Sequence, residues 1–554
     1  MTRAADLLVR SLIRHGVDRV FCVPGESYLS VLDAMVDARE IQVVTTRHEG
    51  GAGFMAVADA KLCGRPGVAF VSRGPGAMNA AIAVHTAQQD AVPFILFVGQ
   101  VERSHLGMNA FQEVDHADVF GSMCKWTAEV HDPGRLADTV ATAFHRARSG
   151  TPGPVVVSLP EDMLEEGPCS VNVPLRGAVR AAAAQDDIEE LCRRIAAAAR
   201  PLIVAGGLLQ TPSGREALAR AAECFGIPVA AAVRQVDVID NDHPQYAGHL
   251  AYGAPAELID ALLQSDLVLG FGTRLGDVTS QGFRFPAAPD PVQPVIQVWP
   301  DATETGSFRD LALGIAADPV EVLLQLAAAA PERPDERHAE WSRRLRKTAA
   351  GLRRWEGLDD AEDGVVFGAL VREVDALLAD DAIIASDAGN FGAWVQKLIR
   401  FGGQRRMVGP CSGAMGFGVP GAVAASLRFP GRQVVGFAGD GGVLMTGNEL
   451  ATAVQYGASP VLIVSDNGSY GTIRMHQERS FPRRLAMTDL RNPDFRAWAE
   501  SFGAKAFQID RAVEIRPVLQ DALAATERPV VVTVRTSLEY ISPATTITRL
   551  TAGD

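Results

Sequence analysis

The chain has 554 residues, too many for one hydrophobic core, because a domain usually holds about 100–200 residues. Apolar residues make up 47% and charged residues 21%, a balance that excludes wholesale disorder. The formal net charge of −14 argues against nucleic acid or an anionic membrane as a partner, since phosphate binding needs clustered cations. The longest apolar stretch, AVPFILFVG, is too short to cross a bilayer. We therefore expect a cytoplasmic protein with no nucleic-acid or membrane partner.

An amphipathic helix is predicted at the start of the chain, and short apolar runs then alternate with alanine-rich, mixed-charge segments. Runs buried on both faces are typical of parallel sheets, and the segments between them are typical of crossover helices. The pattern predicts an α/β fold with doubly wound parallel sheets. In chain order, the runs are DRVFCVPG, VAFVSRGPG, PFILFVG, PVVVSLP, PLIVAGG, PVAAAV, LVLGFG, PVIQVW, AIIASDAG, QVVGFAGDGG, PVLIVSDNG and PVVVTV.

Two segments interrupt this alternation. Residues 166–190 contain Pro and Gly without an apolar run, and residues 331–362 are densely charged. We interpret the first as a connector and the second as a solvated linker that contains a helix. Cutting there predicts three domains, over residues 1–165, 185–330 and 360–540, and a C-terminal tail over 541–554.

The segment GDGGVLMTGNELATAVQYGASPVLIVSDNGSYG carries the most chemistry. It begins where an apolar strand ends, which is where ligands bind in open parallel sheets. Gly439, Gly441 and Gly442 allow the backbone to approach a bulky anion. Asp440 offers a carboxylate, and Asn467 offers an amide oxygen after the next strand. These are ligands that Mg²⁺ prefers, so the segment predicts a magnesium ion held against a diphosphate.

With its closing SDNGSYG, this segment resembles the signature of thiamine-diphosphate-dependent enzymes, and the likeness is nearest to the acetolactate synthase-like branch, whose members include large catalytic subunits. RHEGGAGFMAVADAKLCGRPGVAFVSRGPGAMNA resembles the family's pyrimidine-binding domain, and SDAGNFGAW with CSGAMGFGVPGAV resembles the loops that close over the cofactor rings. The resemblance implies pyrimidine-binding, central nucleotide-binding-like and diphosphate-binding domains, in that order. It also implies that Asp440, Asn467 and the carbonyl of Ser469 bind the metal.

The same resemblance implies a set of cofactor-binding residues. Met415 corresponds to the apolar wedge that holds the cofactor bent, and the carbonyl of Gly413 to an acceptor for its amino group. Without the flanking match, Met415 would be interpreted as ordinary core filler. The full set is Gly389, Asn390, Gly413, Met415, Gly439, Asp440, Gly441, Gly442, Asn467, Ser469, Tyr470 and Gly471.

Catalytic residues are expected in the first domain. The resemblance implies that Glu49 hydrogen-bonds the aminopyrimidine ring and assists proton transfer; a surface Glu favoured by a helix dipole is the alternative. Gln112, beside Phe111, matches a pocket glutamine that can donate to a developing alkoxide, although a plain surface Gln fits the sequence equally well.

Two acidic residues depart from the acetolactate synthase pattern. Glu26 stands where those enzymes have a small residue, and Glu161 stands where they have a lysine. A carboxylate at Glu26 could shuttle protons but would repel a second 2-oxo acid. His105 and His476 are weaker candidates for the pocket.

The expected activity is decarboxylation of a 2-oxo acid, with pyruvate as the expected donor, followed by carboligation. The alternatives are a non-ligating decarboxylase or carbon–carbon lyase acting on an aromatic or acyl-CoA donor, and a catalytically silent family member. Thiamine diphosphate and Mg²⁺ are expected cofactors, while the sequence leaves FAD in the central domain open. The substrates would be small 2-oxo acids or aldehydes, and the family usually builds each site across a homodimer or homotetramer.

Overall fold

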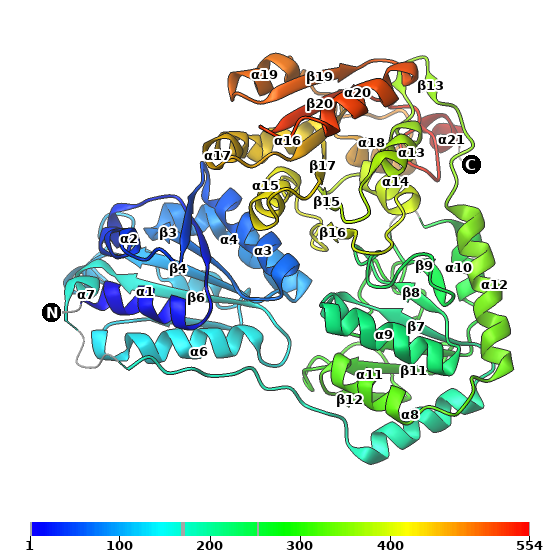
Figure 1. The fold of residues 1–554 in the computed structure, drawn as a ribbon, viewed down its shortest axis with the longest axis horizontal. Helices are drawn as coiled ribbons and strands as arrows, with labels where there is room; N and C mark the ends of the chain where they lie inside the picture. Colours follow the sequence, from blue (N-terminus) through cyan, green and yellow to red (C-terminus); the bar gives the residue numbers. More distant parts are fainter. Residues whose placement is uncertain (1–2, 168–171, 252–253, 553–554) are drawn as a thin grey trace.

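The computed structural model describes residues 3–167, 172–251 and 254–552, which form three α/β domains (Figure 1). Each domain is built on a six-stranded, fully parallel sheet, as the apolar runs predicted. A small antiparallel pair, β13 (Asp360–Ala361) with β14 (Gly364–Val365), precedes the third sheet. None of the helices within these ranges is long and apolar enough to cross a membrane.

The N-terminal sheet has the strand order β2-β1-β3-β4-β6-β5. Its strands are β1 (Arg19–Cys22), β2 (Gln42–Thr45), β3 (Gly67–Ser72), β4 (Phe94–Gln100), β5 (Trp126–Glu129) and β6 (Pro154–Pro160). Its helices are α1 (Ala4–Arg14), α2 (Leu29–Val36), α3 (Glu49–Cys63), α4 (Arg73–Asp90), α5 (His116–Phe120), α6 (Leu136–Arg148) and α7 (Glu161–Glu165).

The middle sheet has a different order, β12-β11-β10-β7-β8-β9. Its strands are β7 (Pro201–Ala205), β8 (Val229–Ala231), β9 (Tyr246–His249), β10 (Leu267–Phe271), β11 (Val295–Trp299) and β12 (Leu313–Ala316). Its helices are α8 (Gln185–Ala197), α9 (Pro212–Phe225), α10 (Ala256–Leu262), α11 (Pro319–Ala328) and α12 (Glu336–Leu352).

The two predicted linkers differ from one another. Residues 172–184 have no helix or strand and cross from the first domain to α8 (Figure 1), while residues 168–171 of this connector lie outside the described residues. The second linker contains the predicted helix, α12, but the helix is not solvated all round. Its Trp341 and Leu345 are buried in the same cluster as Leu258 of α10, so one face belongs to the middle domain.

The C-terminal sheet has the order β16-β15-β17-β18-β20-β19, which repeats the N-terminal order strand for strand. Its strands are β15 (Ile383–Ser386), β16 (Arg406–Val408), β17 (Val434–Gly439), β18 (Val461–Asp466), β19 (Lys505–Ile509) and β20 (Val530–Arg535). Its helices are α13 (Phe367–Leu377), α14 (Phe391–Leu398), α15 (Gly418–Arg428), α16 (Asp440–Thr446), α17 (Leu450–Tyr456), α18 (Gly471–Ser480), α19 (Phe495–Ser501), α20 (Ile515–Leu523) and, in the tail, α21 (Ile547–Ala552).

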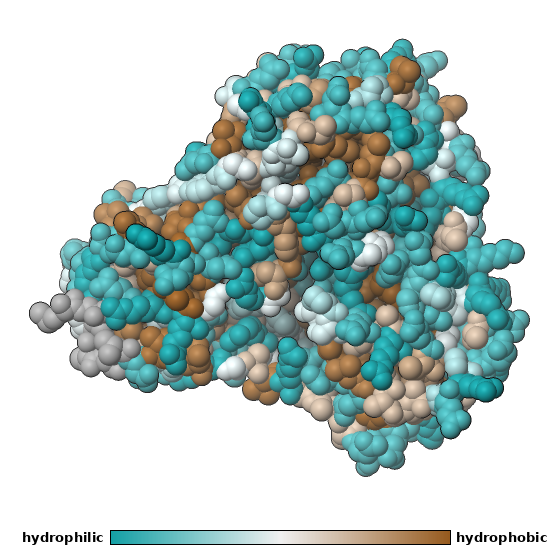
Figure 2. Space-filling model, viewed as in Figure 1, coloured by the Kyte–Doolittle hydropathy of each residue, from teal (hydrophilic) through white to brown (hydrophobic). Residues whose placement is uncertain are grey.

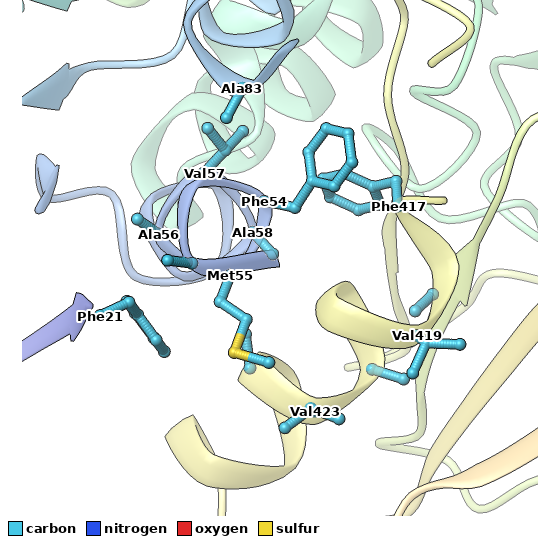
Figure 3. Packing of buried hydrophobic residues seen from close by; sticks show 14 of the residues in the cluster. Phe21, Phe54, Met55, Ala56, Val57, Ala58, Ala83, Phe417, Val419 and Val423 are labelled. Atoms are coloured by element: carbon cyan, nitrogen blue, oxygen red, sulfur yellow. The ribbon is translucent and has the colours of Figure 1, made fainter. Parts of the chain in front are cut away.

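One buried apolar cluster joins the N- and C-terminal domains. Met55 of α3 lies over Val423 of α15 (Figure 3), and the rings of Phe54 and Phe417 meet edge to face with centroids 5.5 Å apart. Burial of such surfaces stabilises the domain pair by roughly 25 cal/mol per Å² of apolar area. On the outside, hydrophilic residues cover most of the face in Figure 2, with hydrophobic patches over the N- and C-terminal domains.

Candidate active site

A cavity of about 240 Å³ lies at the carboxyl edge of the C-terminal sheet. From β15 the chain runs to β16 on one side, and β17 lies on the other side, so the edge between β15 and β17 is a switch point of the kind that binds ligands. Loops that follow β15, β17 and β18 surround the cavity. Every predicted cofactor-binding residue contributes to its lining: Gly389, Asn390, Gly413, Met415, Gly439, Asp440, Gly441, Gly442, Asn467, Ser469, Tyr470 and Gly471.

Asp440 begins α16 and is almost fully buried. Its carboxylate accepts hydrogen bonds from the backbone N–H of Gly441 at 2.9 Å and of Ser469 at 3.3 Å. Asn492 donates to Asp440 at 2.9 Å and to Asp466 at 2.7 Å. Burial raises the pKa of Asp440 to about 6, because its hydrogen-bond donors are neutral and do not offset the loss of water. Asn492 was missed by the sequence analysis, since it lies outside the motif and only folding brings it here.

These residues fit a bound divalent cation. A carboxylate buried among neutral donors lacks a positive partner, and a hard cation would supply it. Asn467 lines the same cavity, and its amide oxygen accepts from the N–H of Ser469 at 3.1 Å. Within the described ranges no group of three or more His, Cys, Asp or Glu side chains could hold a metal, but the predicted ligand set needs only one carboxylate, completed by amide and carbonyl oxygens.

Asp387, directly after β15, fixes the loop that carries Met415. Its fully buried carboxylate accepts from the N–H groups of Gly416, at 2.9 Å, and of Phe417, at 3.3 Å. Burial raises the pKa of Asp387 to about 6. A Cβ at Gly442 would lie 2.7 Å from this carboxylate, so only glycine allows the two loops to approach so closely. Asp387 was also missed as a site residue, although its place at a strand end was a usable signal.

The predicted catalytic residues of the N-terminal domain lie elsewhere in the single chain. Glu49 is the first residue of α3, is partly exposed, and accepts a hydrogen bond from Asn79 at 2.9 Å. The cavity lining runs from Phe367 to Ile541 and includes no residue of the first domain. Phe111 is strongly exposed and Gln112 partly so. One chain therefore does not bring Glu49, Phe111 and Gln112 to the cavity.

Glu26 and Glu161 share one arginine that the sequence analysis overlooked. The two terminal nitrogens of the Arg73 guanidinium lie 3.1 Å from Glu26 and 2.8 Å from Glu161. The signal was the segment SRGPG after β3, which places Arg73 at the carboxyl edge of the sheet. His105 is exposed, with Glu102 3.8 Å away.

A second, larger cavity of about 660 Å³ adjoins the first. The two share Gly389, Asn390 and Gly413 in their linings. His476 and Arg479 of α18 line the second cavity, and Leu550 of α21 contributes from the tail. The middle domain reaches it through Arg234, which donates to the Ser386 hydroxyl at 2.8 Å and to the Asp387 carbonyl at 2.9 Å.

The carboxyl end of β11 differs in one respect from that of a typical dinucleotide-binding sheet. Nucleotide sites of this type place an acidic side chain near the ribose, whereas β11 ends in Trp299. This indole is buried and donates to Thr151 at 2.8 Å and to Glu304 at 3.1 Å. The Arg274 guanidinium lies 4.8 Å from its ring centroid. The contact with Thr151 connects the end of β11 to the first domain.

The fold and the cavity define a three-domain α/β protein with a polar, glycine-rich ligand site at a sheet switch point. Three thiamine pyrophosphate enzyme families match: the N-terminal TPP binding domain over residues 2–119, the central domain over 188–326 and the C-terminal TPP binding domain over 387–534. The chain is 31% identical over 543 residues to the acetolactate synthase large subunit of Corynebacterium glutamicum, covering 95% of this chain and 86% of that protein. It is 33% identical to the large subunit of Parasynechococcus marenigrum (95% and 86% covered) and 29% identical to the isozyme 3 large subunit of Escherichia coli (94% and 92% covered). The chain belongs to the thiamine pyrophosphate enzyme family, in its acetolactate synthase-like branch.

Proposed function

We propose that this chain decarboxylates a 2-oxo acid, with pyruvate as the donor, and joins the remaining acyl unit to a second carbonyl compound. The observation that carries this proposal is that the predicted cofactor residues all line one cavity in a chain related over nearly its whole length to acetolactate synthase large subunits. When bound, thiamine diphosphate supplies the electron sink that allows the bond between carboxylate and carbonyl carbon to break. Asp440, Asn467 and the Ser469 carbonyl would hold Mg²⁺ against its diphosphate.

The protein's own contribution is orientation and proton transfer. Met415, held in place through the Asp387 loop, would press on the cofactor rings, and the carbonyl of Gly413 would accept from the cofactor's amino group. Glu49 would exchange a proton with the pyrimidine ring.

We place the complete site between two chains. Glu49 lies outside the cavity of its own chain, and apolar side chains are exposed on the helices that follow β3 and β17. Met78 and Ile82 of α4 are 42% and 41% exposed, and Leu444 and Met445 of α16 are 47% and 48% exposed. Pairing two chains through α4 and α16 would bury these side chains and bring Glu49 of one chain to the cavity of the other. A homodimer is the smallest such assembly, and a tetramer would repeat it.

This proposal assigns no role to a flavin, because β11 ends in Trp299 where a dinucleotide site would place an acidic side chain. The visible absorption spectrum of the purified protein tests this directly, because bound FAD would give the absorption bands of a flavin. The cytoplasmic location stays a prediction from the sequence.

The direct test of function is to incubate purified protein with pyruvate, thiamine diphosphate and Mg²⁺. We expect release of CO₂ and formation of a carbon–carbon bond. NMR of the products detects that bond. Release of free acetaldehyde without any ligation product would overturn the carboligation part of the proposal.

A second candidate function is cleavage of a longer donor, such as an aromatic 2-oxo acid or an acyl-CoA. The adjoining cavity of about 660 Å³, with Arg479 and His476 in its lining, favours it, because a long anionic donor could extend there from the reacting centre. Comparing kcat/KM across a panel of 2-oxo acids and acyl-CoA thioesters separates the two functions.

A further inference from the structure

Arg73 occupies an unfavourable position for an arginine. It is the first residue of α4 and adopts a left-handed backbone conformation, with φ of +35°. Only 8% of the residue is exposed, and its buried Nε has no hydrogen-bond partner among the described residues. A strained backbone and a buried, incompletely paired charge each cost free energy, and such features concentrate at functional sites.

Two carboxylates from different elements hold this guanidinium. Glu26 follows β1 and Glu161 begins α7, directly after β6. Glu161 lies 2.8 Å from Arg73 and is partly exposed. Glu26 lies 3.1 Å away, and its side chain is 64% exposed, so it faces out from the carboxyl edge of the sheet. We call Glu26, Arg73 and Glu161 the acidic triad, because two negative charges and one positive charge leave it with a net charge of −1.

The acidic triad adjoins the other residues expected to act in catalysis. In the first turn of α4, the N–H of Gly74 donates to the carbonyl of Gln112 at 3.0 Å. A Cβ at Gly76, in the same turn, would lie 3.4 Å from a carboxylate oxygen of Glu49. The first turn of α4 therefore contacts Glu26, Gln112 and Glu161 and lies near Glu49. In the proposed dimer, the triad would face the cofactor cavity of the second chain.

We propose that the acidic triad selects the acceptor of the ligation reaction, and that this acceptor is a neutral aldehyde or ketone rather than a second 2-oxo acid. The inference rests on the proposed function. The positive charge of Arg73 is already shared by two carboxylates, so an acceptor bearing its own carboxylate meets net repulsion. A neutral acceptor meets none, and the Glu26 carboxylate can accept a hydrogen bond from the hydroxyl group that forms.

The reaction balances with pyruvate as donor and acetaldehyde as a probe acceptor. The bond between the carboxylate and the carbonyl carbon of pyruvate breaks, and CO₂ leaves. The electron pair of that bond then forms the new bond to the aldehyde carbon, and the aldehyde oxygen takes up one proton. Pyruvate, acetaldehyde and one proton thus give one hydroxyketone and one CO₂, with no external oxidant or reductant.

The experiment compares neutral and anionic acceptors in competition. Cofactor-loaded enzyme receives ¹³C-labelled pyruvate as donor with unlabelled acetaldehyde or butane-2,3-dione, and NMR measures the ratio of neutral ligation products to the carboxylated product of two pyruvates. We expect the wild-type enzyme to favour the neutral products by at least about tenfold, and the double variant Glu26→Gln/Glu161→Gln to shift the ratio at least about tenfold towards the carboxylated product. Arg103→Met is the matched control, because Arg103 also bridges two carboxylates, Asp162 and Glu166, and is expected to leave the ratio unchanged.

A binding measurement makes the proposal independent of turnover. Lactamide and lactate have nearly the same shape and differ by one charge, and saturation-transfer NMR reports which of them binds the loaded protein. Preference for lactamide in the wild type, reversed in the double variant, supports the acidic triad. Preference of the wild type for lactate, or a product ratio that the double variant does not change, overturns it. If pyruvate releases no CO₂ at all, the proposed function fails. The comparison of lactamide with lactate still decides the charge selectivity of the triad.

Discussion

The N- and C-terminal domains arrange their strands in the same order, yet they place opposite charges at the same point. The third strand of each sheet, β3 or β17, leads directly into a helix, which begins at Arg73 in one domain and at Asp440 in the other. Arg73 is held by two carboxylates, one of them strongly exposed, whereas Asp440 is buried among neutral donors at the wall of a cavity. The shared topology places a charged residue at the same point of both domains, and the partners of that residue decide the net charge around it.

The two domains also touch through equivalent elements. Helix α3 follows β2 and α15 follows β16, and these edge strands correspond in the two sheets. The helices pack together in one apolar cluster (Figure 3), and Arg428 at the end of α15 pairs with Asp59 of α3 at 2.6 Å. Helix α3, which begins at Glu49, is therefore held by the C-terminal domain of its own chain, while the proposed site needs the cavity of another.

The largest effect should come from Glu49→Gln. Glutamine keeps the size of the side chain but cannot exchange a proton, so we expect kcat to fall by about 10²–10⁴-fold. Affinity for Mg²⁺ should change little, since its proposed ligands Asp440, Asn467 and Ser469 all belong to the C-terminal domain. Steady-state kinetics and calorimetric titration measure the two quantities. Unchanged turnover would falsify the role of Glu49 in activating the cofactor.

Asp440→Asn, in the other half of the site, should act mainly on cofactor binding rather than on turnover. Loss of the buried carboxylate removes the charge that a divalent cation would neutralise, so we expect cofactor affinity in the presence of Mg²⁺ to fall by about 100-fold. Calorimetry at fixed Mg²⁺ measures this directly. Asp494→Asn is a suitable control, because this helix-capping carboxylate accepts from Arg496 and Ala497 and does not line the cavity.

Co-expression of the Glu49→Gln and Asp440→Asn chains sharpens the comparison. If each site combines Glu49 of one chain with Asp440 of the other, a mixed dimer contains one intact site, and random pairing should restore about a quarter of wild-type activity. If both residues of a site belonged to the same chain, no mixture would regain activity.

Sequence reasoning predicted the internal strands well and most edge strands poorly. Every apolar run named in the sequence analysis is an internal strand of one of the sheets, because a strand buried on both faces must be apolar throughout. Edge strands have one neighbour and often mix polar and apolar residues, as in β5 and β19. None of the edge strands is among those runs: β2 (Gln42–Thr45), β5 (Trp126–Glu129), β9 (Tyr246–His249), β12 (Leu313–Ala316), β16 (Arg406–Val408) and β19 (Lys505–Ile509).

The residues of the candidate site also fall into two groups, those that a local motif predicts and those that it does not. Cofactor residues follow strand ends in compact motifs, so reading the motifs placed them together in one cavity. Asn492 and Arg73 escaped notice because their importance depends on partners distant in the sequence, Asp440 for one and Glu161 for the other. A local segment such as SRGPG can mark a residue as a candidate, but only the folded chain shows which distant residue it pairs with.

Glu449→Ala tests how the C-terminal domain holds the start of α3. This fully buried carboxylate accepts from the N–H groups of Arg47 and His48, each at 3.1 Å, and from the Thr452 hydroxyl at 2.6 Å. Alanine would leave these donors unpaired, so we expect the free energy of unfolding to fall by about 3 kcal/mol. Glu449→Gln keeps an acceptor oxygen and should lose less. Denaturant unfolding measures both, and a loss no larger than that of the exposed Glu500→Ala would contradict this role.

The smallest predicted effect is a difference between the two domains in how their stability changes with pH. Burial lowers the pKa of His116 in the N-terminal domain to about 4, so between pH 6.5 and 4 the unfolded chain binds a proton that the folded chain does not, and acidification destabilises this domain. Burial raises the pKa of Asp387 in the C-terminal domain to about 6, so between pH 6 and 4 the folded chain binds the extra proton, and acidification stabilises this domain. From pH 7 to 5 these shifts correspond to about 2 kcal/mol lost through His116 and about 1 kcal/mol gained through Asp387. Thermal unfolding at pH 7 and pH 5 measures both effects. Compared with the wild type, His116→Gln should lose less stability on acidification, and Asp387→Asn should lose more. If both variants lose as much stability as the wild type, neither group titrates as its burial requires.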